Sequence, residues 1–239
     1  GIKIMPSSYS TDLKLELMVT GEKAGEWGDI TNTNLVILQQ AIAGYESVAV
    51  NNTQGLTLTF TNGAVSDGKN ATLELTGTLA TTSVDVIVPD GIEATYNIKN
   101  SIDHAGYNVR VKTATGTGVQ IAEGNSYVLY SDGTNVERVS ETKTWRAVTG
   151  AETVQEGAAI LANTNGGAFT LTLPPSPSTG AEVHIIDQGY DFNTNALTVG
   201  RNGSNIANSA ADLTINTQGA GLTLVYSGDA TTGWTYKEK

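Results

Sequence analysis

The spacing of apolar residues along the chain changes near residue 51. Before that point, the stretch EWGDITNTNLVILQQAIAGY (26–45) predicts one helix of about four turns. Asp29 or Thr31 suits its N-cap, and Gly44 suits the position that follows its last turn. Its apolar residues lie close to one helical stripe: Ile30, Leu35, Leu38, Ala41 and Ile42.

A helix of this length is too short to be stable alone in water, so its apolar stripe must rest on another surface. Trp27 stands in a glycine-rich stretch beside the helix, where it can serve as a docking wedge or pack on its own helix. We therefore expect the N-terminal segment to attach the chain to a partner. The residues expected to make that contact are Tyr9, Leu13, Trp27, Ile30, Leu35, Leu38 and Ile42.

From residue 51 onwards the apolar period becomes two. Runs such as GLTLTF, ATLELTG and YNVRVKT alternate apolar with polar residues and are separated by Gly, Asp-Gly or Asn-rich turns. Many short alternating strands at this spacing are typical of a β-sandwich or barrel. The SDGTN stretch (131–135) is a strong hairpin signal, because Asp-Gly supplies the positive φ of a tight turn.

The β-rich region contains two similar halves. Residues 84–139 and 169–236 each carry a strand ending at Pro (Pro89, Pro174), two further strands, and a hairpin with Tyr-Ser at its turn. The predicted fold is mainly β, with a short N-terminal helix followed by two related small β-sandwich or barrel-like modules. The expected divisions are an attachment segment (1–50), a first β-module (51–142) and a second, related β-module (143–239).

The composition excludes several classes of protein. The 239 residues carry a formal net charge of −11, so the basic surface that nucleic acids require is missing. With no Cys there are no disulfides and no thiolate chemistry. No stretch approaches the roughly 18 apolar residues of a membrane span, and no signal-peptide pattern begins the sequence. Either Gly1 follows a removed Met or Met5 is the natural start.

Residues suited to metal binding are sparse. His184 is expected to be a half-buried strand residue bonded to a neighbour, and His104 an exposed turn residue. The loop Asp187–Asn195 places carboxylates and amides at short intervals, but it lacks the Gly and Glu of an EF-hand loop. Asn and Asp are also common in turns for conformational reasons, so both interpretations of this loop stay open.

The motifs of catalysis are likewise missing. No phosphate-binding loop and no G-x-S-x-G element occurs, and any pair of carboxylates in so acidic a chain would be an arbitrary choice. We expect no enzyme activity, no cofactor and no metal. Exposed Tyr and Trp favour sugar and protein contacts, so Tyr190, Tyr226 and Trp234 are candidate receptor contacts, with core packing the competing interpretation for Trp234.

The stretch 9–44 resembles the N-terminal segment of tailed-bacteriophage tail-fibre and related virion structural proteins. The resemblance rests on Tyr9–Leu13, Gly21-Glu22, Trp27-Gly28 and the helix from Asn32 to Gly44. Residues 84–136 look like the small β-domain that often follows in these proteins. The C-terminal half, ending TTGWTY, is similar to terminal domains of phage virion proteins.

This resemblance implies a virion component, made in the host cytoplasm and exposed on the particle exterior. The leading expectation is a homotrimeric short tail fibre or tail or baseplate appendage, which docks by its N-terminus and presents its β-modules for host contact. Expected partners are copies of itself, other virion proteins, and a host surface glycan or protein, without nucleic acid or membrane insertion. The alternatives are a capsid decoration protein and a carbohydrate-binding module or polysaccharide-degrading protein.

Overall fold

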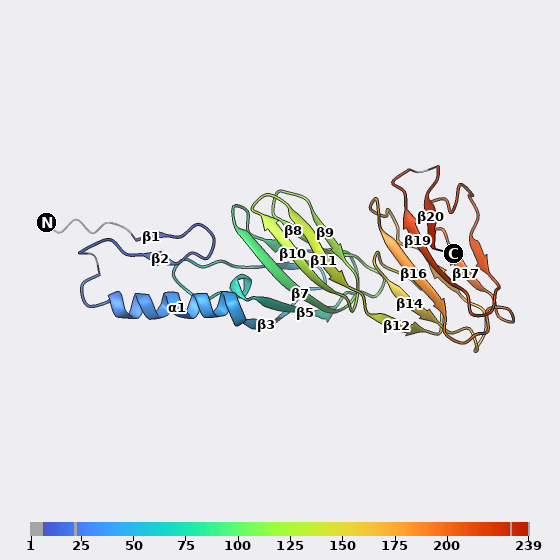
Figure 1. Ribbon diagram of the computed structural model, residues 1–239, viewed down its shortest axis with the longest axis horizontal. Coiled ribbons are helices and arrows are strands. Elements are labelled where there is room, and N and C mark those ends of the chain that lie inside the picture. Colours follow the sequence, from blue (N-terminus) through green and yellow to red (C-terminus); the bar gives the residue numbers. More distant parts are fainter. Residues whose placement is uncertain (1–6, 22, 230, 239) are drawn as a thin grey trace. The chain divides into compact units, whose positions relative to one another are not determined.

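The computed structural model describes residues 7–21, 23–229 and 231–238, so Met5 and Glu22 lie outside the described part of the chain. Its regular structure is mostly strands, with one α-helix, α1 (Trp27–Ala43), and one short 3₁₀ turn, η1 (Asp67–Lys69), among the described residues. The chain divides into two compact units (Figure 1). The first contains residues 1–103, 109–120 and 126–142, and the second contains 104–108, 121–125 and 143–239.

In the first unit, the strands from β3 to β8 alternate between two sheets. One sheet has the order β11-β10-β7-β5-β3 and the other the order β4-β6-β8-β9. β3, β5 and β7 pair in parallel, as do β4, β6 and β8, so the chain winds through three stacked coils. The strands are β3 (Tyr45–Ala49), β4 (Leu56–Thr57), β5 (Thr72–Thr78), β6 (Val84–Val88), β7 (Glu93–Asp103), β8 (Val109–Thr113), β9 (Gly118–Ile121), β10 (Ser126–Asp132) and β11 (Val136–Thr142).

The second unit repeats this topology strand for strand. Its sheets have the orders β12-β14-β16-β19-β20 and β13-β15-β17-β18, with parallel pairs in the coils and antiparallel β19 and β20. The two halves recognised in the sequence therefore correspond to one topology used twice. The strands are β12 (Trp145–Val148), β13 (Glu152–Thr153), β14 (Ala159–Ala162), β15 (Thr170–Thr172), β16 (Glu182–Asp187), β17 (Leu197–Gly200), β18 (Leu213–Ile215), β19 (Gly221–Tyr226) and β20 (Trp234–Glu238).

Each unit is thus a short β-solenoid, and the expected sandwich or barrel-like modules are wrong. The mainly β composition with one helix is confirmed. Alternating apolar residues indicate a strand with one buried face, which is the same in a solenoid coil and in a sandwich hairpin. The predicted hairpin at 131–135 does occur, between β10 and β11, where Gly133 has φ +83° and the Asp132 carboxylate accepts from the backbone of Thr134 and Asn135.

Each core lies between the two sheets of its unit. In β6, Val84, Val86 and Val88 are buried while the residues between them are not, as the period-two pattern requires. The second core is built by apolar side chains from both sheets, with Phe192 and Trp234 as its fully buried aromatic residues. His104, expected to be exposed, is fully buried, and its backbone N–H donates to Glu123 within the second unit.

The helix begins and ends slightly differently from the prediction. It starts at Trp27, and Glu26 occupies the N-cap position without a side-chain cap hydrogen bond. Gly44 follows the last residue as expected, but its φ is −68°, so it does not adopt the left-handed conformation. A Cβ at Gly44 would lie 2.4 Å from the carbonyl oxygen of Gln40, which explains the glycine by close approach.

The division of the chain places residues 1–50 in the same unit as most of residues 51–142, while 104–108 and 121–125 belong to the second unit. The reason is β3, which the sequence analysis assigned to the attachment segment but which pairs along its whole length with β5. Residues 7–44, which carry β1 (Ser8–Tyr9), β2 (Glu16–Leu17) and α1, precede the first coil. We call them the N-terminal arm.

The loop that follows β16 is held by the buried carboxylate of Asp187. Its Oδ1 accepts from the backbone N–H of Asp191 (3.3 Å), and its Oδ2 accepts from those of Phe192 (3.3 Å) and Gly219 (2.9 Å). Asp187 is 1% exposed, so its oxygens are directed at backbone donors within the loop. This arrangement gives the acidic residue a structural role.

Asp187→Asn should destabilise the second unit by about 2–4 kcal/mol, because the new NH₂ group would face backbone donors in a buried site. Urea unfolding followed by the fluorescence of buried Trp234 measures this change. Asp212→Asn is the matched control, since Asp212 is exposed and its Oδ1 accepts one backbone bond, from Arg201 (2.9 Å), and should cost less than about 1 kcal/mol. Equal costs for the two variants would contradict the anchoring role.

Candidate docking surface

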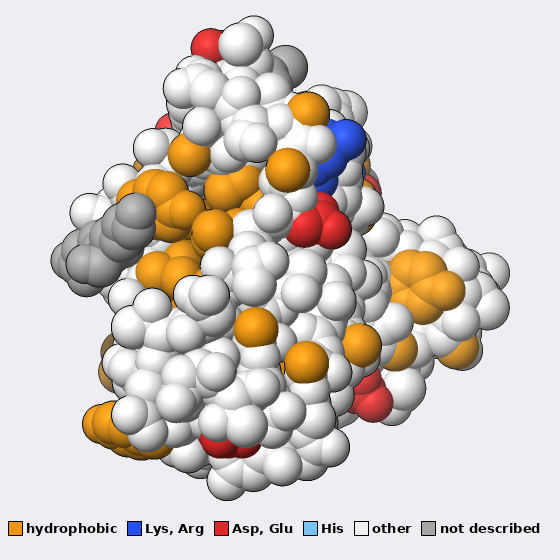
Figure 2. Space-filling model, turned by 90° about the vertical axis from the view of Figure 1, so that its right-hand side faces the viewer, with side chains coloured by type: hydrophobic (Ala, Val, Ile, Leu, Met, Phe, Trp, Pro, Cys, Tyr) orange, Lys and Arg blue, Asp and Glu red, His pale blue; other side chains and the backbone are white. Residues whose placement is uncertain are grey.

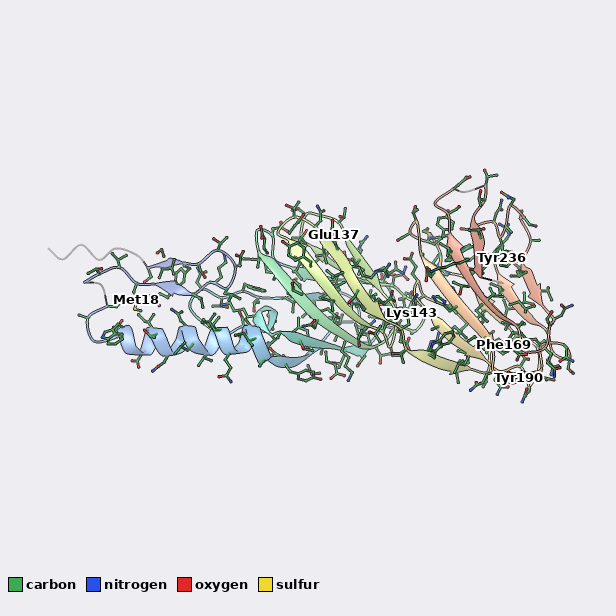
Figure 3. All side chains as sticks on the ribbon, in the orientation of Figure 1. Met18, Glu137, Lys143, Phe169, Tyr190 and Tyr236 are labelled. Carbon is green, nitrogen blue, oxygen red and sulfur yellow. The ribbon has the colours of Figure 1, made fainter. Side chains whose placement is uncertain are left out.

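The N-terminal arm is built from a two-stranded hairpin and the helix beside it. β1 and β2 pair antiparallel, and the side chain of Asn34 ties the hairpin to α1. Its Oδ1 accepts from the backbone N–H of Glu16 (3.0 Å), and its Nδ2 donates to the carbonyl of the same residue (2.9 Å). Met18, labelled in Figure 3, points toward the first turn of α1 and is half-buried. The hairpin and the helix are therefore packed together and joined by hydrogen bonds.

The arm is joined to the first solenoid at the end of α1. The Gln40 side chain donates from Nε2 to the carbonyl of Ser66 (3.0 Å) and accepts at Oε1 from the backbone N–H of the same residue (3.3 Å). The Ala71 N–H donates to the Gln40 carbonyl (3.1 Å). Near the hairpin, the backbone N–H of Gly63 donates to the Lys14 carbonyl (2.8 Å). These bonds fix the arm at its base.

The helix buries only one of its side chains completely. That residue is Ile37, at 0% exposure, which the predicted stripe did not include. Ile30, Leu38 and Ala41 are half-buried beside it. Leu35 and Ile42 belong to the predicted stripe but lie to one side of this covered face, and they are 57% and 80% exposed. The stripe therefore divides into a covered part and an exposed part.

The arm leaves an unusual amount of apolar surface in solvent. Trp27 is 65% exposed at the start of the helix, and Leu17 is 47% exposed at the end of β2. Isolated exposed apolar residues are ordinary, but several on one short segment mark a contact surface. We call the exposed large apolar residues of α1 the arm surface, and they are Trp27, Leu35, Val36 and Ile42.

The two remaining candidates for docking, Tyr9 and Leu13, are half-buried in the hairpin. The ring of Tyr9 lies beside Gly63, where an added Cβ would come within 3.1 Å of it. These two side chains therefore pack within the first unit and offer less surface than the arm surface does. Ile30 and Leu38 share this partial cover.

Charges near the arm are predominantly acidic. A hollow of about 360 Å³ between hairpin and helix is lined in part by Glu16, Glu26 and Asp29. Lys23 lies 3.5 Å from the Glu16 carboxylate and 3.8 Å from that of Glu26, so one ammonium group offsets this charge. Across the described residues, no group of His, Cys, Asp or Glu is arranged to hold a metal ion, including the Asp187–Asn195 loop.

The candidate receptor contacts differ in exposure. Trp234 is fully buried, and Tyr226 packs on it with ring centroids 5.6 Å apart. Trp234 therefore has no surface to offer a receptor, and the competing core interpretation is the correct one for this residue. Tyr190 is 66% exposed on the loop after β16, and Figure 3 labels it there. Tyr226 is half-buried, so Tyr190 is the most exposed of the three.

A polar network lies on the face of β16 opposite the core of the second unit. The sequence analysis did not predict it. The Glu182 carboxylate accepts from Lys143 Nζ (2.9 Å) and Lys237 Nζ (2.7 Å). Lys143 Nζ also lies 2.7 Å from His184 Nε2, and His184 Nδ1 lies 3.0 Å from Thr223 Oγ1. The prediction of a half-buried, hydrogen-bonded His184 is confirmed.

This network changes the titration of its members. Partial burial alone would raise the pKa of Glu182, but the hydrogen bonds and charges of Lys237 and Lys143 outweigh it and lower the pKa to about 2. Burial lowers the pKa of His184, and the charge of Lys143 lowers it further against the opposing effect of Glu182. The folded state thus favours ionised Glu182 and neutral His184.

Comparisons with known proteins do not assign a family. No family model and no curated protein matches the chain. Among solved structures, one described as "Structure of a chaperone-substrate complex" is similar over 81% of this chain, with 15% identity and a TM-score of 0.40. The chain spans 32% of the length of that protein. Within the described residues, no helix has the length and apolar character needed to cross a membrane.

Two isoleucines of α1 provide a matched test of the arm surface. In dilute solution, Ile37→Ala should destabilise the helix by about 2–4 kcal/mol, because it opens a cavity under α1. Ile42→Ala should change stability by less than about 0.5 kcal/mol, since that side chain is exposed. Thermal unfolding followed by circular dichroism at 222 nm distinguishes them. If Ile42→Ala were the more damaging variant, the assignment of the exposed face would be wrong.

The Glu182 network predicts a defined acid sensitivity. A carboxylate with a lowered pKa stabilises the fold above its ordinary value of 4.5, and this contribution is lost as the pH falls toward about 2. The difference in unfolding free energy between the native chain and Glu182→Gln should therefore shrink over that pH range. Glu137→Gln, at an exposed residue labelled in Figure 3, should show no such trend. A pH-independent difference for Glu182→Gln would refute the network's role.

Proposed function

We propose that the chain is a structural protein of a bacteriophage particle, a short tail fibre or a tail or baseplate appendage. In this proposal the N-terminal arm docks the protein and the two solenoids extend outward on the particle exterior for host contact. Support comes from the resemblance of residues 9–44 to virion attachment segments and from the exposed apolar residues of α1. The exposed apolar residues of α1 carry the proposal, because a binding partner would remove them from water.

The energetics favour a covered arm surface. Removing a large apolar side chain from water stabilises an assembly by about 1.5–3 kcal/mol. Trp27, Leu35 and Ile42 are all more than half exposed, so most of this stabilisation is not yet realised in the single chain. The three residues occupy one side of a helix that the side chains of Asn34 and Gln40 attach to the rest of the first unit, so association has to order less of the chain than it would for an unattached helix.

We propose that α1 packs against the α1 helices of other copies of the same chain. Leu35, Leu38 and Ile42 are separated by three and then four residues, the spacing at which helices pack side by side in a coiled coil. We propose a homotrimer, the state that the resemblance implies, with these residues at its axis. Trp27, at the opposite end of the helix, then remains for contact with a tail or baseplate protein.

The solenoids suit an exterior position. Their outer surface is mostly uncharged and polar, and Figure 2 shows only a few charged side chains on the face that it draws. Uncharged polar side chains suit exposure to water, while the net charge of −11 favours solubility and makes free copies repel one another. The same features fit capsid decoration, so the location on the particle decides between tail and capsid.

Leu35→Ser with Ile42→Ser should convert the purified protein from a trimer into a monomer, because the substitutions remove the apolar side chains at the proposed axis. Light scattering during gel filtration measures the mass directly. The control is Val65→Ser with Val139→Ser, which replaces two equally exposed apolar residues of the first unit outside the arm. A monomeric native protein, or a trimer that survives the arm substitutions, contradicts self-association.

Particle attachment is tested in the phage that encodes the chain. Native protein should be found in purified particles by mass spectrometry and located at the tail by gold labelling, and Trp27→Ser should reduce its incorporation at least about tenfold. Label spread over the capsid would establish decoration instead. Absence of the native protein from purified particles would remove the proposed function altogether.

A further inference from the structure

In the first unit, β5, β7, β10 and β11 belong to the larger sheet (Figure 1). A shallow hollow on the outer face of this sheet is lined by residues of these four strands. It has a volume of about 210 Å³. This is below the roughly 300 Å³ at which sites for drug-sized ligands begin, so it fits one small ring. Its lining side chains include Asn97, Lys99, Ser126, Val128, Ser140 and Thr142.

The sheet register explains why these residues meet. Asn97, Val128 and Ser140 occupy one row across β7, β10 and β11, and Lys99, Ser126 and Thr142 occupy the adjacent row. Between the two strands of the hairpin the register shifts at Val128/Leu129, so that Val139 is an extra residue in β11. Such a bulge locally changes the direction of side chains, and bulges are frequent beside binding sites.

The polar groups of the hollow are available to a ligand. Ser126, Ser140 and Thr142 are exposed, and their hydroxyls make no hydrogen bond within the described part of the chain. The Asn97 side chain donates from Nδ2 to the Ala71 carbonyl (2.7 Å), which leaves its Oδ1 as an acceptor. The hollow therefore offers several donors and acceptors around the half-buried apolar side chain of Val128.

The charge at one edge of the hollow is already balanced. Lys99 Nζ lies 2.8 Å from Glu74 Oε1, which also accepts from Ser101 Oγ (2.7 Å), while Oε2 accepts from the Tyr45 hydroxyl. An anionic ligand would have to compete with Glu74 for Lys99 in a chain of net charge −11. A cationic ligand would meet the Lys99 ammonium. An apolar ligand would leave the hydroxyls without partners.

A neutral ligand with several hydroxyl groups satisfies all of these conditions. Each hydroxyl can accept from Lys99 Nζ, which has further N–H groups, or donate to Asn97 Oδ1, and each can do both with Ser or Thr. A ring with an apolar face can rest on Val128. We propose that the hollow binds one neutral saccharide unit, held by Asn97, Lys99, Ser126, Ser140 and Thr142.

This site is separate from the arm surface, and only its biological setting, a glycan on the host surface, rests on the proposed function. Binding of a saccharide by the purified chain needs no particle. Failure to bind would therefore leave the attachment proposal intact, and failure to attach would leave saccharide binding intact. The same reasoning makes a direct binding measurement on the isolated full chain the appropriate test.

The probes are methyl α-D-glucopyranoside, methyl β-D-galactopyranoside and N-acetyl-D-glucosamine, each titrated to about 50 mM because so small a site gives a weak complex. We expect at least one of them to produce saturable shifts in the amide NMR signals of Lys99, Ser126 and Ser140. Ser126→Ala with Ser140→Ala should weaken that binding by about tenfold or more. Ser47→Ala, at an exposed serine of β3 on the same sheet, is the matched control and should bind normally.

Several results would overturn the proposal. Among them are the absence of saturable shifts with all three sugars, shifts that the double serine variant leaves unchanged, and equal shifts from inorganic phosphate, which would indicate an anion site at Lys99. Both variants replace exposed hydroxyls, so their folded state can be verified from the unchanged remainder of the spectrum. Loss of binding in the control as well as in the double variant would also contradict the assignment.

Discussion

The burial of alternating strand side chains between two sheets is the interaction on which each unit depends. Every coil sends one strand to each sheet, and the parallel pairs place each coil directly on the previous one. A coil cannot bury its apolar face alone, so stability comes from stacking neighbours. The strands at the end of each unit extend both sheets without adding another parallel coil: in the second unit β18 extends the smaller sheet and β19 and β20 extend the larger one. Each solenoid therefore completes its own core.

The N-terminal arm is the part of the chain that does not complete its own core. It contributes Ile37 to the first unit and is held by the side chains of Asn34 and Gln40, but Leu35 and Ile42 remain in solvent. A helix of this length gains little from its own hydrogen bonds, so the fixed arm is stabilised mainly by these few contacts. The arm is therefore the segment of α1 and its hairpin whose apolar side chains are only partly covered, which is why we propose it as the docking segment.

The alternating strands, the single helix, the hairpin at 131–135 and the doubled order of segments could all be predicted from the sequence. They depend on local periodicity and on turn residues, which act over a few positions. The solenoid winding could not, because Leu73 and Leu75 alternate with polar residues in the same way whether their neighbours are parallel or antiparallel. The predicted buried face of α1 differed from the observed one for a similar reason, because tertiary packing determines that Ile37 is buried and Leu35 is exposed.

The Glu182 network and the hollow of the first unit could not be predicted from the sequence, because each depends on strand register. Lys143 and Glu182 are far apart in the sequence, and they meet through the pairing of β12, β14 and β16. The residues that line the hollow of the first unit come from β5, β7, β10 and β11, and the bulge at Val139 has no sequence signal stronger than a slightly uneven alternation. Outward positions on β7 and β10 could be listed from periodicity, but their neighbours across the sheet could not.

The central claim is that each solenoid buries its core within the single chain, while the arm surface becomes buried only when another chain binds it. Hydrogen exchange of backbone amides tests it most directly, with the isolated chain compared at low and high concentration. The account predicts that β5, β7, β14 and β16 are strongly protected at both concentrations, while α1 is weakly protected in dilute solution and gains protection on association. Protection of α1 equal to that of β7 in a dilute, monomeric sample would contradict it.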